Sequence, residues 1–202
     1  MKIMQLKYIF YLAIIMLLSS CAKENLDNFG KYYVYMSKDT ASVTLRDTLF
    51  VVNNDTLDKE ITLSRLGVSR SGWRETNPGI GVTLQTKASY VDSLVAIFNN
   101  TTIPTSAKSS LVLFVGNNAK LPSTCFSMDT VLNFELNKYT VPVNLKLKLK
   151  DIARLKGSVA YTVPVFLATT NSPSDTIKTT KRYCVLKIKP SFVIKKTDTV
   201  NP

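Results

Sequence analysis

Side chains that usually carry out catalysis are scarce in this chain of 202 residues. Histidine is absent, which removes the commonest general base and the Ser-His and Cys-His nucleophile pairs. No two of the few acids have the spacing of a paired-carboxylate hydrolase. Without histidine, and with the aspartates dispersed, a zinc or calcium site is not expected either. The sequence therefore predicts a protein with no catalytic residues, no metal and no cofactor.

The single tryptophan, Trp73, is a candidate for ligand binding. It lies between two predicted strands, next to Arg74. An exposed indole would stack on a sugar ring while the guanidinium of Arg74 bonds the hydroxyls. The alternative, which we favour, is an indole that closes one end of the hydrophobic core, because tryptophan is usually largely buried.

Most aspartates in this sequence are followed directly by a residue with a hydroxyl group. Seven of the ten aspartates are followed by Ser or Thr and then by an apolar residue. This resembles the Asp-Ser/Thr-apolar acceptor sequence of the Bacteroidetes envelope O-glycosylation system. The candidate acceptors are Thr40, Thr48, Thr56, Ser93, Thr130, Thr176 and Thr199. Turn chemistry, with Asp ending a turn and Thr opening a strand, explains the same pattern. We expect Thr199 to be the most accessible acceptor, Thr56 the next, and Ser93 the least.

Basic residues outnumber acidic ones by 26 to 14. Lys146, Lys148 and Lys150 alternate with leucines, as Lys187 and Lys189 do with apolar residues. These lysines indicate either an anionic partner or, as we prefer, a solvated sheet face. Nucleic acid is not an expected partner.

Cys125 and Cys184 are predicted to be two free thiols, although a bridge between them stays open.

Residues 1–20 have the form of a lipoprotein signal peptide. Lys2 and Lys7 precede an unbroken apolar run over residues 8–18, which is too short to cross a membrane. The sequence Leu-Ser-Ser-Cys that follows resembles the bacterial lipobox, so Cys21 is the predicted lipidated residue. Cleavage before Cys21 would lower the formal charge from +12 to +10. The expected location is the outer membrane, lipid-anchored through residues 21–29 and surface-exposed rather than facing the periplasm.

The rest of the chain is predicted to be all-β. Apolar and polar residues alternate most clearly over 140–150, which is typical of a strand with one buried face. Other strands are expected at 32–37, 41–52, 60–68, 81–86, 109–115, 131–136, 158–168 and around 183–189. Residues 89–98 do not alternate and predict one short helix. The expected fold is an immunoglobulin-like β-sandwich of about 7–9 strands over residues 30–190, with a flexible tail at 191–202.

Several short motifs, in order, resemble a known family. They are YVYMS, VDSLVAIFN, Leu121-Pro122 with Phe126-Ser127, Asp151 with Leu155, YTVPV and YCVLKIK. The chain resembles the Bacteroidetes lipoprotein domain called domain of unknown function 1735, an immunoglobulin-like module, over roughly residues 30–190. Residues 99–120 depart from it as a strand-like insertion. The resemblance implies a surface role in glycan utilisation and implies no catalytic residues.

Three classes of function follow. The first is a non-catalytic surface lipoprotein that binds glycan or assists a neighbouring glycan-uptake protein. The second is a structural or adhesive subunit, similar to a pilus component. The third, which we favour least, is an envelope hydrolase.

Overall fold

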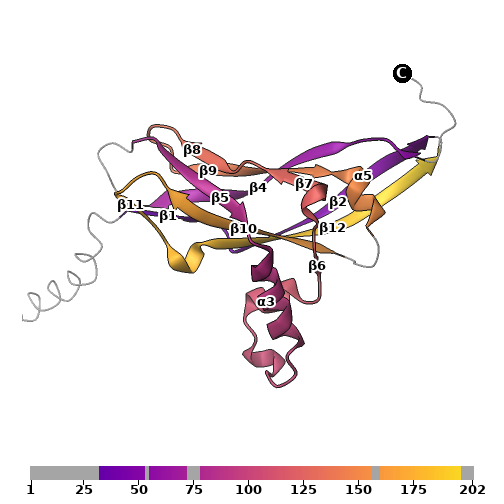
Figure 1. Ribbon diagram of the computed structural model, residues 1–202, viewed down its shortest axis with the longest axis horizontal. Coiled ribbons are helices and arrows are strands. Elements are labelled where there is room, and N and C mark those ends of the chain that lie inside the picture. The colour runs from indigo at the N-terminus through magenta and orange to yellow at the C-terminus, as the bar shows by residue number, and fades with distance from the viewer. Residues whose placement is uncertain (1–31, 53–54, 72–77, 156–159, 197–202) are drawn as a thin grey trace, which may run out of the picture.

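The protein is a sandwich of two β-sheets with a helical hairpin projecting from it (Figure 1). The computed structural model describes residues 32–52, 55–71, 78–155 and 160–196. This architecture confirms the predicted all-β sandwich. Eight of the twelve strands in the described part of the chain have four or more residues, which agrees with the strand number expected from the alternation.

One sheet has five strands, in the order β11-β1-β4-β9-β7. Their bounds are β1 Tyr32–Met36, β4 Glu60–Ser71, β7 Phe126–Met128, β9 Thr140–Lys148 and β11 Asp175–Ile177. The pairings are antiparallel except that between β1 and β11, which is parallel.

The other sheet has seven strands, six of them in the order β3-β2-β12-β10-β5-β8, while β6 pairs with β10. Their bounds are β2 Thr40–Val52, β3 Asp55–Thr56, β5 Ile80–Thr86, β6 Ala119–Lys120, β8 Val131–Phe134, β10 Tyr161–Thr170 and β12 Tyr183–Lys196. The longest pairing is parallel and joins β2 to β12, from Thr40 opposite Val185 to Val51 opposite Lys196.

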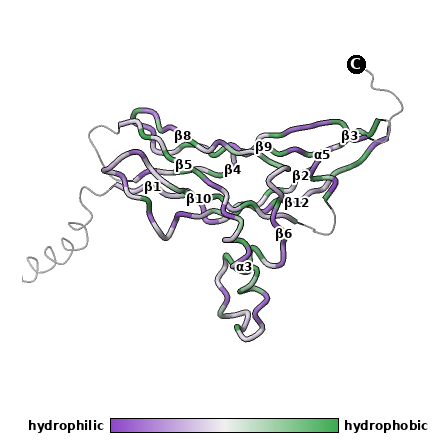
Figure 2. The backbone as a smooth tube through the Cα atoms, in the orientation of Figure 1, coloured by the Kyte–Doolittle hydropathy of each residue, from purple (hydrophilic) through white to green (hydrophobic). Residues whose placement is uncertain are grey.

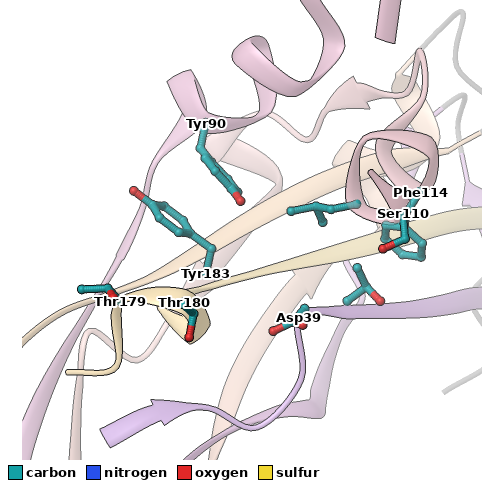
Figure 3. Close-up of a pocket in the computed structure, with 9 residues that line it drawn as sticks. Asp39, Tyr90, Ser110, Phe114, Thr179, Thr180 and Tyr183 are labelled. Atoms are coloured by element: carbon teal, nitrogen blue, oxygen red, sulfur yellow. The ribbon is translucent and has the colours of Figure 1, made fainter. Parts of the chain in front are cut away.

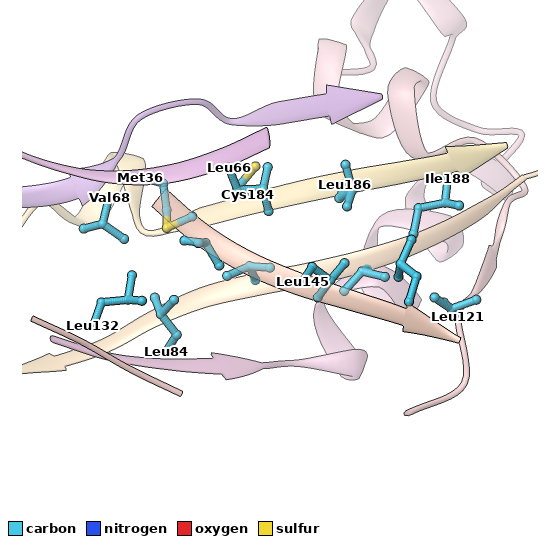
Figure 4. Packing of buried hydrophobic residues seen from close by; sticks show 14 of the residues in the cluster. Met36, Leu66, Val68, Leu84, Leu121, Leu132, Leu145, Cys184, Leu186 and Ile188 are labelled. Carbon is cyan, nitrogen blue, oxygen red and sulfur yellow. The ribbon is translucent and has the colours of Figure 1, made fainter. Parts of the chain in front are cut away.

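The core lies between the inner faces of the two sheets (Figure 4). In β9, Val143, Leu145 and Leu147 are buried, whereas Lys146 and Lys148, which follow Leu145 and Leu147, are exposed. Figure 2 shows the same succession of hydrophobic and hydrophilic residues along the strands. Burial of alternate side chains fixes the register, because a slip by one residue would turn every lysine of β9 toward the core.

The helical hairpin consists of α3 (Ala88–Asn99) and α4 (Ser110–Val115), with a 3₁₀ turn at Thr105–Ala107 between them. In α3, Val91 and Leu94 are buried at helical spacing and pack with Val112 and Val115 of α4. This second hydrophobic cluster also contains Val185 of β12. The hairpin is therefore seated on the outer face of the seven-stranded sheet.

The prediction of a strand at 109–115 is wrong, as is that of a strand-like insertion at 99–120. The Ser109 side chain accepts a hydrogen bond from the Val112 N–H and so starts α4. Gly116 ends it at a φ of 56°, where a side chain would be strained. A short apolar run has no periodicity that separates strand from helix, and here the caps decide.

Two further predictions, on where strands end, are wrong. A third helix, α5 (Leu149–Arg154), begins one residue after β9, so Lys150 belongs to a helix. The tail predicted from residue 191 begins too early, because β12 continues to Lys196 alongside β2. The lysines at 146 and 148 also lie on a different sheet from those at 187 and 189, so they form no common stripe.

No helix in the described ranges is long and apolar enough to cross a membrane.

Candidate functional site

A pocket opens where the helical hairpin meets the seven-stranded sheet (Figure 3). Its volume is about 490 Å³. Aromatic rings and hydroxyl groups from α3, α4, β2 and β12 contribute most of its wall. The lining residues are Asp39, Thr40, Tyr90, Ser110, Leu111, Phe114, Thr179, Thr180 and Tyr183.

Two tyrosines form one wall of this pocket. Tyr90, from the first turn of α3, and Tyr183, the first residue of β12, are stacked with ring centroids 3.9 Å apart and planes 15° apart. Phe166 of β10 lies behind Tyr183, at a centroid distance of 4.7 Å. The stack joins the hairpin to the sheet, so it fixes the angle at which the hairpin stands.

Arg182 holds the back of the aromatic stack in place. Its guanidinium lies 4.6 Å from the Phe166 ring centroid. Its Nε donates to the Leu167 carbonyl at 2.9 Å and its Nη2 to the Ala168 carbonyl at 2.7 Å. Those carbonyls lie where the register of β10 against β5 shifts, between Leu167 and Thr169. Arg182 thus donates hydrogen bonds to the carbonyls at an irregular point of the strand pairing, and its guanidinium supports the Phe166 ring beside Tyr183.

The polar groups of the pocket come from short segments at strand and helix starts. Asp39 precedes β2 and Thr40 opens it, Ser110 opens α4, and Thr179 and Thr180 lie in a 3₁₀ turn before β12. Burial raises the pKa of Tyr90, and the nearby Tyr183 and Asp39 raise it further. The Tyr90 phenol therefore stays protonated at neutral pH and is available as a hydrogen-bond donor.

An aromatic wall beside hydroxyls and one carboxylate suits a small polar ligand with an apolar face. A sugar ring has this character, since its C–H face packs on an aromatic ring and its hydroxyls bond polar groups at the rim. Asp39 is the one carboxylate among the lining residues. Paired-carboxylate glycoside hydrolysis needs a second carboxyl group across the scissile bond.

Several site residues predicted from the sequence lie outside the described ranges. They are Cys21, Trp73, Arg74 and Thr199. Of the other candidate acceptors, Thr40 lines the pocket, and Thr48 and Thr56 are half-buried in β2 and β3. Ser93, Thr130 and Thr176 are exposed.

The expected shielding of Ser93 is wrong. The α3 segment does pack through Val91 and Leu94, but Ser93 lies on the outer side of the helix and is exposed. Its hydroxyl donates to the Ser89 carbonyl at 3.0 Å. Thr56, expected to be the second most accessible acceptor, pairs with Val51 in the sheet and is half-buried.

The aspartates of the Asp-Thr/Ser pairs make contacts of their own. Asp47 accepts from Lys59 at 2.7 Å, Asp92 from Lys120 at 2.8 Å, and Asp55 from both Lys150 and Arg154. Four of the six described pairs also stand at the start of a strand: Asp39-Thr40, Asp55-Thr56, Asp129-Thr130 and Asp175-Thr176. Strand-opening chemistry thus accounts for most of the pattern, and the same residues still present hydroxyls.

Cys125 and Cys184 are both buried and free, as the sequence analysis favoured. Cys184 lies in β12 among the core residues, where burial raises its pKa to about 12.

Sequence reasoning missed the residues that build the pocket. Tyr90 stood in the non-alternating segment and Tyr183 at the start of the last predicted strand, 93 positions apart in the chain. The available signal was an aromatic residue at the first turn of a predicted helix, which alone does not say what it faces.

Comparisons with known proteins find likeness in fold. A putative carbohydrate-binding protein from Bacteroides ovatus is 15% identical at a TM-score of 0.50, covering 79% of this chain and 37% of its own. EndoBT-3987 from another Bacteroides species, solved with a Man5GlcNAc product, is 15% identical at a TM-score of 0.50, covering 78% and 31%. A multidomain Bacteroides ovatus protein including domain of unknown function 1735 is 8% identical at a TM-score of 0.44, covering 79% and 44%.

The chain therefore spans about a third to less than half of the length of these three structures. No family model and no curated protein matches it. The two structures with a TM-score of 0.50 share the fold with this chain at 15% identity.

Proposed function

We propose that this protein is a non-catalytic lipoprotein, anchored to the outer membrane through Cys21 and exposed at the cell surface, that binds a glycan in the pocket beneath the helical hairpin. The observation that carries the proposal is the pocket, which Tyr90, Tyr183 and Phe114 line together with Asp39 and four hydroxyl side chains. The shared fold with a putative carbohydrate-binding protein gives secondary support.

Size and chemistry both support a glycan ligand. A volume of about 490 Å³ is within the range of small-ligand sites, which run from roughly 300 to 1,000 Å³. Aromatic rings supply apolar contact at low entropic cost, because each has only two side-chain torsions to fix. The hydroxyls of Thr40, Ser110 and Thr180 both donate and accept, as sugar hydroxyls do.

Affinity electrophoresis against a panel of neutral polysaccharides tests the proposal. The chain should be retarded by at least one polymer, and Tyr90→Ala should lose that retardation because the removed ring faces the pocket. Tyr139→Ala is the matched control, since Tyr139 is 47% exposed and is not among the lining residues.

Thermal unfolding followed by circular dichroism checks that both variants are folded. If no neutral polymer retards the wild-type chain, or if Tyr90→Ala binds as tightly as Tyr139→Ala, glycan binding in this pocket is wrong.

A second candidate, a structural or adhesive subunit, has one observation in its favour. β12 covers one edge of β2 along its length, whereas β3 pairs with the other edge only at Val51 and Val52. Among the described residues, no strand pairs with β2 at that edge over residues 40–50, so the edge can accept an added strand. Ladders of stable multimers on gels would favour this function.

A further inference from the structure

A line of basic side chains runs along the outer face of the β2–β12 pair and begins next to the pocket, where Lys187 lies 4.4 Å from the ring centroid of Phe114. Parallel pairing sets Ser42 beside Lys187, Thr44 beside Lys189, Arg46 beside Ser191 and Phe50 beside Lys195. Residues directly opposite in a sheet share a face. The first three pairs follow one another about 7 Å apart along the strands, and the fourth lies about 13 Å further on, beyond Thr48 and Val193. We call Arg46, Lys187, Lys189 and Lys195 the basic ladder.

The cations of the basic ladder have little compensation. The one acidic residue within β2, Asp47, lies on the opposite face, in phase with buried Leu45 and Leu49, and accepts from Lys59. Within the described part of the chain, the structure shows no ion pair for any of the four. Burial lowers the pKa of Lys187, and the like charge of Lys189 lowers it further.

Hydroxyl groups accompany the charges. Three of the four cations stand beside a serine or threonine in the paired strand: Ser42, Thr44 and Ser191. Each of these steps therefore offers a positive charge and a hydroxyl within one strand spacing of each other, about 5 Å. A ligand that alternates anionic groups with hydroxyls would satisfy both.

The shape of the protein around the basic ladder favours a linear polymer over a planar membrane as the ligand. The helical hairpin projects from the same outer face, where its cluster includes Val185, and Phe114 of α4 lies 4.4 Å from the Lys187 ammonium (Figure 1). A planar lipid surface would meet the hairpin before it reached Lys187 and Lys189. A linear polymer can lie along the strands beside the hairpin.

We propose that the basic ladder binds a linear anionic polysaccharide, one whose sugar units carry carboxylate or sulfate groups. This site adjoins the pocket at Phe114, but it uses other residues and takes a ligand of different charge, so it does not depend on the proposed function. Phe50 and Val193, 45% and 56% exposed at the far end of the ladder, offer apolar contact to the C–H faces of the last units.

Polygalacturonate, a linear polycarboxylate, is the probe. The test variant is the triple substitution Arg46→Gln, Lys189→Gln and Lys195→Gln, all at exposed positions. The matched control is Lys138→Gln, Lys146→Gln and Lys148→Gln, which removes the same charge from exposed positions in and next to β9 of the other sheet. Both triple variants are made in the full chain that also carries Cys21→Ser, so that no acyl anchor contributes to binding.

We expect the ladder variant to lose about tenfold in affinity, the sum of three exposed ion pairs, and the control to change less than about twofold. Wild-type binding should also weaken between ~0.05 M and ~0.5 M NaCl as the charges are screened. Equal losses in both variants would mean attraction to net charge alone and would overturn the proposal, as would no loss in either.

A vesicle arm separates the polymer from a membrane. Tighter binding to phosphatidylglycerol vesicles than to polygalacturonate would overturn the assignment of a polysaccharide. The pocket is tested with neutral polymers and the basic ladder with polygalacturonate, so failure in one assay leaves the outcome of the other standing.

Discussion

Arg70 and Asp175 form a two-point ion pair inside the sandwich, although 105 positions separate them in the chain. Arg70 Nε donates to Asp175 Oδ1 at 2.9 Å and Nη2 donates to Oδ2 at 2.8 Å. The side chains are 1% and 0% exposed. Arg70 Nη1 also donates to the Pro78 carbonyl, and the Ser172 hydroxyl donates to Asp175 Oδ2. The pair fastens β4 to β11, the two strands on either side of β1.

Replacing one partner of this pair should destabilise the fold strongly. Asp175→Asn leaves a buried guanidinium without its counter-charge, and we expect a loss of about 3–5 kcal/mol in the free energy of unfolding, measured by urea titration. Asp92→Asn is the control, because Asp92 and Lys120 form an exposed pair worth about 0–1 kcal/mol. The double variant Arg70→Met/Asp175→Leu should be more stable than Asp175→Asn; a double variant as unstable as the single one contradicts this account.

Stability should fall in acid through the carboxylates of half-buried Asp47 and exposed Asp55. The hydrogen bond from Lys59 lowers the pKa of Asp47, and that from Lys150 lowers the pKa of Asp55, both from an ordinary value of 3.8. A depressed folded pKa gives stability that is present above the unfolded value and lost as pH falls through the folded one. We expect unfolding midpoints to decline below about pH 4, and less so in the double variant Asp47→Asn/Asp55→Asn. An identical acid limb in that variant would exclude these two groups as the cause.

Cys184 should be inert in the folded protein. Burial raises its pKa from 9.0 to about 12, and the thiolate is the reactive form. Iodoacetamide at about pH 8.5 should leave the native chain unmodified at Cys184 and label it fully in denaturant, as read by mass spectrometry. By linkage, the buried thiol contributes stability below the unfolded pKa near 9 that is lost as pH rises toward 12. Labelling at equal rates with and without denaturant would contradict the buried position.

The helical hairpin should open before the sandwich does. Among the residues that the structure describes, its cluster has five buried members, of which Val185 belongs to the sheet, whereas the main cluster has 25. We expect Val112→Ala to cost about 1–2 kcal/mol and to speed amide exchange within α3 and α4 alone. Leu145→Ala, in the main core, should cost about 2–5 kcal/mol and speed exchange in both sheets. Exchange that accelerates everywhere in Val112→Ala would show that the hairpin and sandwich unfold as one unit.

The alternation of apolar and polar residues along single strands predicts most of the fold from the sequence. The β9 lysines and leucines, and the core face of β12, lie as their order predicts, because a two-residue period has one buried solution. The prediction of a strand at 109–115 is wrong because it rests on the apolar run and not on the helix caps Ser109 and Gly116. The pocket and the Arg70–Asp175 pair were out of reach, since each joins residues that only the tertiary fold brings together.

The parallel pairing of β2 with β12 makes the order of folding events predictable. β2 is synthesised more than 130 residues before the strand that completes it, and a parallel pair forms no hairpin to bring the two together. The closing contact is therefore among the most non-local in the chain, which places folding in the slow, millisecond-to-second range of high-contact-order proteins. Until β12 arrives, β2 presents both of its edges over residues 40–50. Chains stalled before residue 183 should thus aggregate or be degraded, while those released after residue 196 fold to completion.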